Sequence, residues 1–504
     1  MEKLKVLLVS PEAVPFGKTG GLADVAGALP KAISALGHDA RLVMPLYSHI
    51  DRSKFSVDKT SSDLTAEIAG REEKFTLFKD DTEGRAFDSW FIDHQGFYAR
   101  DELYRNPKTG KDWEDNDERF GFFSMAVLES CRATGFMPDI IHCNDWQSGL
   151  IPAFMKVDPR YAEFHGIPSL LSIHNIAYQG NFPPESFLKL GLAGSLFAPG
   201  QGFEFWGMVS YLKAGVWYAD LLNTVSDRYA REIQSSPEYG YGFEGILHDR
   251  SANLFGVLNG IDDDIWNPAR DALIPAKFTP DKLSGKAKCK VALRRRTKLP
   301  NVRRDVPIIG IISRLTDQKG FDLISQVADE LMGLDIQTAI LGTGDQKYHD
   351  LFTDLQKKYP RKLSVKLGFD DELAHLIEAG SDMFLMPSRY EPCGLNQMYS
   401  LKYGTIPIVR ETGGLADTIE NANPARGTGT GFVFRNYDSR EMLNAIKFAL
   451  EVYKDKNVWE VMMLRGMRQD FSWIASAAKY VELYKRAIEK KHKVSSQGTA
   501  AQSD

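Results

Sequence analysis

A glycine-rich loop near the start of the sequence combines a lysine with two adjacent glycines. Lys18 precedes Gly20 and Gly21, which open a predicted helix after a short apolar run. Free backbone amides and the helix dipole at such a position favour an anion, and phosphate is the natural ligand. A tight turn with an exposed lysine is the structural alternative.

The same loop fails two better-known phosphate-binding patterns. A P-loop would need a glycine at position 12, where the sequence has Glu12. A dinucleotide fingerprint needs another glycine spacing, and the next predicted strand, 41–44, ends at Pro45 without an acidic residue. The sequence therefore disfavours a P-loop ATPase and a hydride-transfer enzyme.

A second charged segment, 313–320, follows the apolar run 308–312 and contains Arg314 and Lys319. In a strand-to-helix turn, a planar guanidinium and a point-like ammonium can lean toward one anionic group. This arrangement predicts a diphosphate clamp. Two basic residues five positions apart are also compatible with ordinary surface charges.

A third segment, 387–395, follows the apolar run 383–386 and contains a carboxylate beside a proline and a cysteine. Pro392 suits the first turn of a helix, so we expect Glu391 at a helix N-terminus, surrounded by backbone amides. A simple helix cap is the alternative. We expect Cys393 to be a small buried residue, because the sequence identifies no histidine partner for a cysteine nucleophile.

Polar and aromatic residues in the first half of the chain favour a sugar ligand. His142 and Asp145 lie at one predicted strand and His174 follows the next, so we expect their side chains at the same sheet edge. Trp146 and Tyr98 add aromatic faces on which a sugar ring can pack, while the polar groups bind its hydroxyls. Single histidines and tryptophans more often belong to a core.

The elements that must position these residues are short apolar runs, each followed by a polar turn and a longer helical pattern. Such runs predict parallel strands covered on both faces, an α/β fold. The runs occupy residues 6–9, 140–142, 170–173, 221–225, 308–312, 339–341, 383–386 and 406–409. The hexapeptide Thr-Gly-Gly-Leu-Ala-Asp at 19–24 returns at 412–417, in two predicted strand-to-helix loops. The repeat favours two Rossmann-like halves, although six matching residues can arise by chance.

Length and composition indicate a globular enzyme with two domains. The 504 residues are 43% apolar and 26% charged, and the turn-rich stretch after 258 predicts domains at 1–258 and 259–473. The net charge of −5 disfavours nucleic acid as a partner. Four cysteines without metal-ligand spacing predict no metal site and a cytoplasmic protein, and no apolar run is long enough for a membrane. The polar segment 495–504 is expected to be disordered.

Seven segments together resemble bacterial glycogen synthases and plant starch synthases. They follow the family's order over about 6–484 and occupy 18–24, 142–146, 174–180, 259–262, 313–320, 388–395 and 412–417. The resemblance implies a GT-B fold, with two Rossmann-like parallel-sheet domains facing a deep inter-domain cleft. It also implies that a terminal helix at about 474–491 packs back onto the first domain. ADP-glucose as donor, an α-1,4-glucan as acceptor and no cofactor follow from the same resemblance.

Residue roles can be carried over from the family position by position. Arg314 and Lys319 would bind the donor diphosphate, and Glu391 would hold the transferred glucose. The other positions carried over as substrate-contacting are Lys18, Gly20, Gly21, Asp24, Asp145, Trp146, His174, Asn259, Gly342, Gly344, Asp345, Phe369, Cys393, Gly394, Leu395, Thr412, Gly413 and Gly414. Of these, Asp145 and His174 are expected to be catalytic. Phe369 stands where similar enzymes often carry a tyrosine, so stacking on the base is retained and a hydroxyl contact is lost.

The family transfers glucose with retention of configuration, and the sequence offers no evident paired-carboxylate nucleophile. Same-face attack is therefore favoured, with the departing phosphate oxygen accepting the proton of the acceptor hydroxyl. One alternative is a transferase for another nucleotide sugar, such as a sucrose-forming enzyme, against which the 18–24 loop argues. Another is a silent glucan-binding scaffold, which would be expected to have lost Glu391, Arg314 or Lys319.

Overall fold

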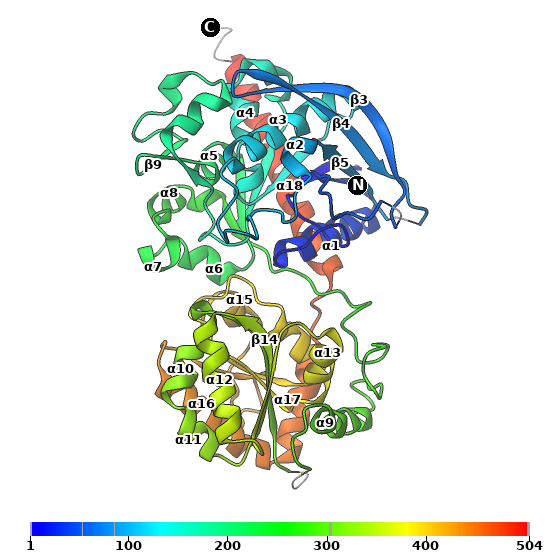
Figure 1. Ribbon diagram of the computed structural model, residues 1–504, viewed down its shortest axis with the longest axis vertical. Coiled ribbons are helices and arrows are strands. Elements are labelled where there is room, and N and C mark those ends of the chain that lie inside the picture. The colour runs from blue at the N-terminus through cyan, green and yellow to red at the C-terminus, as the bar shows by residue number, and fades with distance from the viewer. Residues whose placement is uncertain (1–2, 53, 85, 302–304, 501–504) are drawn as a thin grey trace. The chain divides into compact units, whose positions relative to one another are not determined.

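The structure is a computed structural model that describes residues 3–52, 54–84, 86–301 and 305–500, and the chain in it divides into two compact units (Figure 1). Unit 1 comprises Met1–Val225, Ala230–Gly260 and Trp473–Asp504. Unit 2 comprises Ser226–Tyr229 and Ile261–Ser472. Among the described residues, no helix combines the length and the apolar character that crossing a membrane requires.

Unit 1 is built on a nine-stranded sheet with a parallel centre and an antiparallel edge. Its strands, in spatial order, are β12 (Leu254–Gly256), β11 (Leu221–Thr224), β7 (Ser169–Ile173), β6 (Ile140–Asn144), β1 (Lys5–Val9), β2 (Asp39–Pro45), β5 (Asp88–Asp93), β4 (Arg71–Asp80) and β3 (Val57–Ile68). All pairs from β12 to β5 are parallel, whereas β4 runs antiparallel to both β5 and β3. A small second sheet has the order β8 (Asn181–Phe182), β10 (Met208–Ser210) and β9 (Glu204–Phe205).

Unit 2 has a six-stranded sheet that is parallel throughout. Its order is β15 (Leu363–Leu367), β14 (Gln337–Gly344), β13 (Ile308–Leu315), β16 (Met383–Met386), β17 (Ile406–Arg410) and β18 (Phe432–Phe434). Counted along the chain within the unit, this is the order 3-2-1-4-5-6 of the doubly wound fold.

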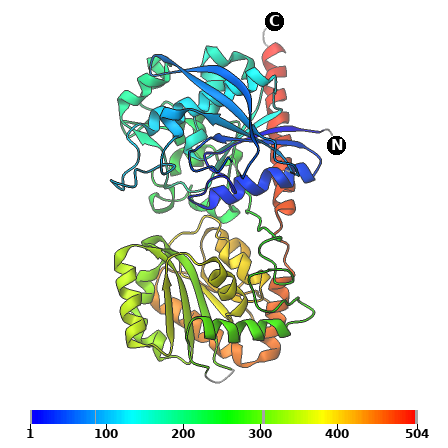
Figure 2. The same cartoon turned by 45° about the vertical axis from the view of Figure 1, so that its right-hand side comes forward.

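Helices cover both sheets (Figures 1 and 2). The helices that precede unit 2 in the chain, together with the terminal helix, are α1 (Gly21–Ala35), α2 (Gln95–Tyr98), α3 (Asn116–Thr134), α4 (Ile151–Val157), α5 (Tyr211–Tyr218), α6 (Asp227–Glu232), α7 (Pro237–Gly240), α8 (Glu244–Asp249) and α18 (Trp473–Ala500). Those of unit 2 are α9 (Ser284–Arg296), α10 (Phe321–Gln326), α11 (Ala328–Gly333), α12 (Gln346–Lys358), α13 (Asp371–Gly380), α14 (Asn396–Lys402), α15 (Gly413–Thr418), α16 (Ser439–Lys454) and α17 (Lys456–Met467).

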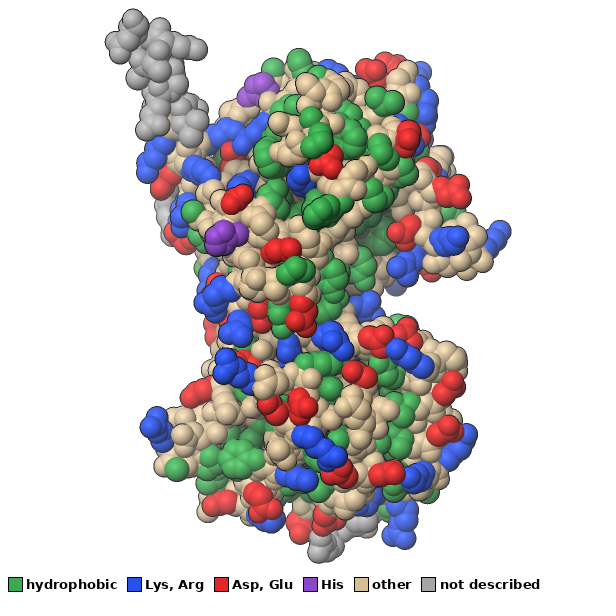
Figure 3. Space-filling model, turned by 90° about the vertical axis from the view of Figure 1, so that its left-hand side faces the viewer, with side chains coloured by type: hydrophobic (Ala, Val, Ile, Leu, Met, Phe, Trp, Pro, Cys, Tyr) green, Lys and Arg blue, Asp and Glu red, His purple; other side chains and the backbone are tan. Residues whose placement is uncertain are grey.

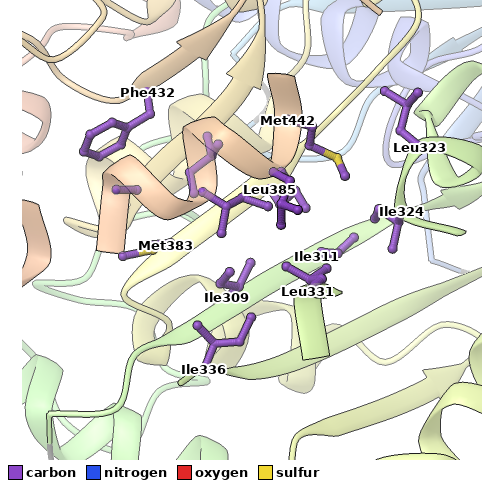
Figure 4. Packing of buried hydrophobic residues seen from close by; sticks show 14 of the residues in the cluster. Ile309, Ile311, Leu323, Ile324, Leu331, Ile336, Met383, Leu385, Phe432 and Met442 are labelled. Atoms are coloured by element: carbon purple, nitrogen blue, oxygen red, sulfur yellow. The ribbon is translucent and has the colours of Figure 1, made fainter. Parts of the chain in front are cut away.

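The core of unit 2 shows why its strands read as continuous apolar runs. Ile309 and Ile311 of β13 and Leu385 of β16 lie buried against Leu323 of α10 and Met442 of α16 (Figure 4). A second cluster covers the opposite face of the same sheet, with Ile308 and other residues of the strands. A strand that is buried on both faces cannot alternate polar and apolar residues.

All eight strands expected from apolar runs are confirmed, and the expectation of purely parallel sheets is wrong at one edge. β3 and β4 were not expected, because β3 exposes most of its polar side chains and carries no continuous apolar run. Antiparallel strands with one solvated face give this weaker pattern.

Helix α18 belongs to unit 1 and returns to its sheet from the end of the chain. The Tyr484 hydroxyl lies 2.9 Å from His142 Nδ1, and the Tyr480 hydroxyl accepts from Asn223 Nδ2 at 3.2 Å. The helix reaches Ala500, beyond both the expected helix end near 491 and the expected start of a disordered tail at 495. Extending a helix costs less than nucleating one, which is why it continues into this polar segment. The remainder of the expected tail, 501–504, lies outside the described residues.

In each unit one strand order reversal marks a ligand-binding edge. In unit 1 the reversal lies between β1 and β6, and in unit 2 between β13 and β16. Ligands of doubly wound sheets bind beyond the carboxyl ends of the strands at this point. The loops there carry Lys18 and Asp145 in unit 1, and Lys319 and Glu391 in unit 2.

Candidate functional site

The loop between β1 and α1 presents open backbone around a paired lysine. Lys18 Nζ donates to both carboxylate oxygens of Asp24, at 2.7 and 2.8 Å. A Cβ atom added at Gly21 would meet nothing within 4 Å, and one at Gly20 would meet only Glu12 Oε1 at 3.7 Å. No described residue of unit 1 requires glycine at these positions for space, so the first turn of α1 is open to an approaching ligand.

Glu12, which sequence reasoning considered only as a missing P-loop glycine, fixes this loop from beneath. Its Oε2 accepts the Thr19 amide at 2.5 Å and the Thr19 hydroxyl at 2.6 Å. The side chain is buried, and burial raises its pKa against the opposing effect of the two Thr19 hydrogen bonds. A buried carboxylate bonded to a glycine-rich loop holds that loop in one conformation. The role of Glu12 could have been found from the sequence only by predicting that residues 12 and 19 lie close together at the two ends of the loop.

Asp145 has a strained backbone at the end of β6. Its φ of 54° and ψ of −172° lie in a region that is almost reserved for glycine. The conformation is held by the Asp145 amide, which donates to Ser172 O at 2.9 Å, and by Asp145 Oδ1, which accepts the His174 amide at 2.7 Å. Burial raises the pKa of Asp145 to about 7, with the amides of His174 and Asn175 opposing the rise. Strain and a perturbed carboxyl together are typical of a functional position.

His174 lies beside Asp145, and Asn144 fixes its tautomer. Asn144 Nδ2 donates to Val9 O at 3.0 Å, which turns Asn144 Oδ1 toward His174 Nε2 at 2.9 Å. Nε2 therefore carries the proton and Nδ1 is the acceptor of the ring. Burial lowers the pKa of His174 to about 4, so the imidazole is neutral.

His142 does not join this group, and the expectation that it lies at the sheet edge is wrong. Its Nε2 lies 2.6 Å from Ser172 Oγ and its Nδ1 lies beside Tyr484 of α18. Burial lowers its pKa to about 3, as expected for a neutral core histidine. Successive side chains of a strand point to opposite faces, and α18 covers the face to which His142 points.

The other predicted residues of unit 1 lie at different depths. Trp146 is buried between Phe120 and Phe182, with ring centroids 5.0 and 5.6 Å away. Tyr98 is fully buried and donates its hydroxyl to Arg119 O at 3.0 Å, so it exposes no surface to a sugar here. Asn259 is also buried, and its Oδ1 has no hydrogen-bond partner among the described residues. This oxygen is therefore able to accept a hydrogen bond from a ligand.

In unit 2 a lysine and a glutamate from neighbouring loops form a buried ion pair. Lys319 Nζ lies 2.6 Å from Glu391 Oε2, and Ser388 Oγ donates to the same oxygen at 3.0 Å. Among the described residues, Oε1 of Glu391 receives no hydrogen bond. Lysine has three protons, so Lys319 can hold Glu391 and still donate to an anion. Arg314 stands exposed at the end of β13.

The loop that carries Glu391 is held by backbone packing rather than by a helix. Helix α14 begins at Asn396, so the expected position of Glu391 at a helix N-terminus is wrong. The chain instead turns at Gly394, which has a φ of +70°. A Cβ atom at Gly413 would lie 2.0 Å from Glu391 O, and one at Gly414 2.0 Å from Cys393 O. The loop of Thr412, Gly413 and Gly414 therefore packs closely against the backbone of Glu391 and Cys393 and holds that segment in place.

The remaining predicted residues follow the strands beside β13. A Cβ atom at Gly342 would lie 1.9 Å from Ser313 O, and one at Gly344 2.4 Å from Leu315 O, so both glycines bring β14 close to the Arg314 segment. Asp345 precedes α12. Phe369, after β15, is 91% exposed. Cys393 is buried, as expected, and Leu395 directly precedes α14.

Comparison with known proteins gives two matching family models. One, described as the starch synthase catalytic domain, matches residues 5–249. The other, described as glycosyl transferases group 1, matches residues 296–460. The two together cover the loops that carry Lys18, Asp145, Lys319 and Glu391, whereas Asn259 lies between the matched ranges.

Curated relatives match nearly the whole chain. The glycogen synthase of Koribacter versatilis is 46% identical over 487 residues, which are 96% of this chain and 98% of the relative. The glycogen synthase of Syntrophotalea carbinolica is 44% identical over 493 residues, or 97% of this chain and 100% of the relative.

Solved structures agree on the fold. The catalytic domain of starch synthase IV from Arabidopsis thaliana, described as bound to ADP and acarbose, superposes with a TM-score of 0.87 at 31% identity and covers 97% of this chain and all (100%) of that chain. Sucrose-phosphate synthase from Thermosynechococcus elongatus, at 17% identity and a TM-score of 0.58, shares the fold alone, with 96% of this chain and 99% of that chain covered. The two doubly wound units thus form a GT-B fold, and the chain belongs to the glycogen and starch synthase family of glycosyltransferases.

Proposed function

We propose that this protein transfers glucose from ADP-glucose to the 4-hydroxyl at the non-reducing end of an α-1,4-glucan, with retention of configuration. The observation that carries the proposal is the buried contact of Lys319 with Glu391, beside the exposed Arg314, at the switch point of unit 2. It combines fixed cations for a leaving diphosphate with a carboxylate for a sugar. ADP rather than another nucleotide is supported by the ADP-bound starch synthase relative.

Breaking the bond between glucose and ADP creates negative charge on the diphosphate and positive charge on the anomeric carbon. In the proposal Arg314 and Lys319 stabilise the diphosphate, and Glu391 accepts hydrogen bonds from the glucose through Oε1. Preorganised charges act most strongly where charge develops in the transition state. Phe369, almost fully exposed, supplies an aromatic face for the base, and the Gly342 and Gly344 segment lines the nucleotide.

The residues of unit 1 take part in the same reaction in this proposal. The open first turn of α1 at Gly21, together with Lys18, binds phosphate oxygens. Asp145 stabilises the positive charge of the glucosyl group. The neutral His174 accepts a hydrogen bond from a sugar hydroxyl through Nδ1. Asn259 Oδ1 accepts another. The acceptor's 4-hydroxyl transfers its proton to the departing phosphate, so the enzyme mainly positions both reactants.

The test is a transfer assay with purified protein, glycogen primer and radiolabelled ADP-glucose or UDP-glucose. The proposal expects label in glycogen from ADP-glucose, release of that label by an α-1,4-specific hydrolase, and little transfer by a Glu391→Gln variant. Label that resists this hydrolase, or faster transfer from UDP-glucose, contradicts it. A phosphorylated hexose as the better acceptor would favour a disaccharide-forming enzyme instead.

A further inference from the structure

Two exposed aromatic residues of unit 1 share an unusual backbone conformation. Trp206 and Tyr241 have φ values of 54° and 51°, and they are 81% and 41% exposed. Among the described residues they are the aromatic members of a group of six non-glycine residues with positive φ. Left-handed backbone is costly for a bulky side chain and persists where the surroundings or a function maintain it.

Each aromatic residue precedes a glycine whose amide donates to a nearby glutamate. Trp206 precedes Gly207, whose amide donates to Glu204 Oε1 at 2.7 Å. Tyr241 precedes Gly242, whose amide donates to Glu244 Oε2 at 2.9 Å. Trp206 and Gly207 form the two-residue turn between β9 and β10, and both have positive φ. Such turns favour Asn-Gly, so tryptophan is an unfavourable choice for the turn itself.

The turns at Trp206-Gly207 and Tyr241-Gly242 lie side by side. A Cβ atom added at Gly242 would be 3.2 Å from Trp206 Nε1, so the indole edge borders the Tyr241 turn. Gln179 Nε2 donates to Tyr241 O at 3.0 Å, and Asn181 Nδ2 donates to Gln179 Oε1 at 2.9 Å. Figure 3 views the side of the molecule on which β9 lies in Figure 1, and hydrophobic and acidic side chains share the surface of unit 1 there.

The small sheet that carries Trp206 follows, in the chain, a segment that packs on a residue of the candidate sugar site of the same unit. A Cβ atom at Gly180 would lie 2.5 Å from the Trp146 ring, so the chain packs on that ring immediately before it enters β8. β8 pairs with β10, which carries the Trp206 turn. The path from Trp146 to Trp206 therefore runs through one backbone segment and one small sheet.

We propose that Trp206 and Tyr241 form a platform that binds the α-1,4-glucan acceptor at a distance from its reacting end. Sugar rings pack their apolar faces on aromatic rings, and side-chain amides and carboxylates bond to their hydroxyls. The flanking carboxylates of Glu204 and Glu244 disfavour a polyanion as the ligand. The identity of the ligand as the acceptor glucan rests on the proposed function.

The experiment uses Trp206→Asn and Tyr241→Asn, since asparagine tolerates left-handed backbone. We expect each variant to bind glycogen about three- to tenfold more weakly, in affinity electrophoresis and in the KM for glycogen. The KM for ADP-glucose should stay unchanged, and the melting temperature should not fall. Leu188→Asn, at an exposed apolar residue of unit 1 outside the platform, is the matched control and should bind glycogen as the wild type does.

Unchanged glycogen affinity in both variants of an active enzyme would overturn the platform. So would the conversion of a dimer into monomers by Trp206→Asn, which would make the surface an interface between copies of the chain. A wild type that binds glycogen through Trp206 but transfers no glucose would refute the proposed function and leave the platform intact.

Discussion

The ion pair between Lys319 and Glu391 offers the sharpest test of the proposed chemistry, through the variant Lys319→Met. Methionine keeps most of the volume of lysine and removes its charge. The two charged atoms are 2.6 Å apart, and the side chains are only 17% and 8% exposed. At this distance of 2.6 Å and an effective dielectric constant of about 20, their Coulomb attraction is about 6 kcal/mol.

Desolvation of both groups offsets much of that attraction, so we expect the single variant to lose about 3 kcal/mol of unfolding free energy. The loss arises because the Glu391 carboxylate stays buried without its partner. We expect kcat/KM for glucosyl transfer to fall by about 10² to 10³, since a preorganised cation is lost from the transition state. Initial-rate assays and thermal unfolding measure the two effects.

The double variant Lys319→Met/Glu391→Gln separates structure from catalysis. Replacing both members of a buried pair is often close to neutral for stability, so its melting temperature should return toward that of the wild type while activity stays low. Lys357→Met is the control, because Lys357 pairs with Asp354 at 2.9 Å with both side chains about 70% exposed (72% and 73%). Recovery of activity in the double variant, or loss of less than about tenfold in Lys319→Met, would refute the reasoning.

Further predictions concern four other positions. The pKa of Asp145, raised by burial to about 7, means that the folded state binds a proton more tightly than the unfolded state, so stability should decline from about pH 4 to pH 7. Activity that needs the carboxylate should rise about tenfold from pH 6 to pH 8, and Asp145→Asn should abolish both trends in unfolding and rate profiles. Glu12→Gln should raise the KM for ADP-glucose about tenfold by loosening the Thr19 loop, and an unchanged KM would show that the loop needs no anchor. Gly413→Ala should cost about 1–3 kcal/mol in chemical denaturation, because its Cβ meets Glu391 O. Phe369→Ala should weaken ADP binding by about 1–3 kcal/mol in calorimetry without lowering the melting temperature, and equal affinity would exclude stacking on the base.

The sequence predicted the fold where burial imposes a simple pattern. Strands such as β16 are covered on both faces, so their apolar runs mark their bounds, here 383–386 in both prediction and structure. β3 lacks such a run because it is rich in polar residues, most of which are exposed, and it was missed. Motif loops after the strands were located correctly because strand ends are visible in the sequence.

The contacts within the candidate site were harder to predict, because they join distant segments. His142 was predicted at the sheet edge. Its side chain instead points to the face that α18 covers, where it lies beside Tyr484, 342 residues later in the chain. Glu12 supports the Thr19 loop because the chain folds back within seven residues, which the local sequence does not reveal. The position of Glu391 was misjudged because Pro392 is compatible with a helix start, whereas packing of Gly413 and Gly414 favours an open turn.

The repeated hexapeptide at 19–24 and 412–417 shows that the same sequence motif can be under two different structural constraints. In its first copy a Cβ atom at Gly21 would meet no described atom within 4 Å, so a library of substitutions at Gly21 should leave folding unchanged and lower only the enzymatic activity. In its second copy Gly414 abuts the carbonyl of Cys393, so the same library should lower the yield of folded protein. The two copies would therefore differ in the substitutions they tolerate, although their amino-acid sequences are identical.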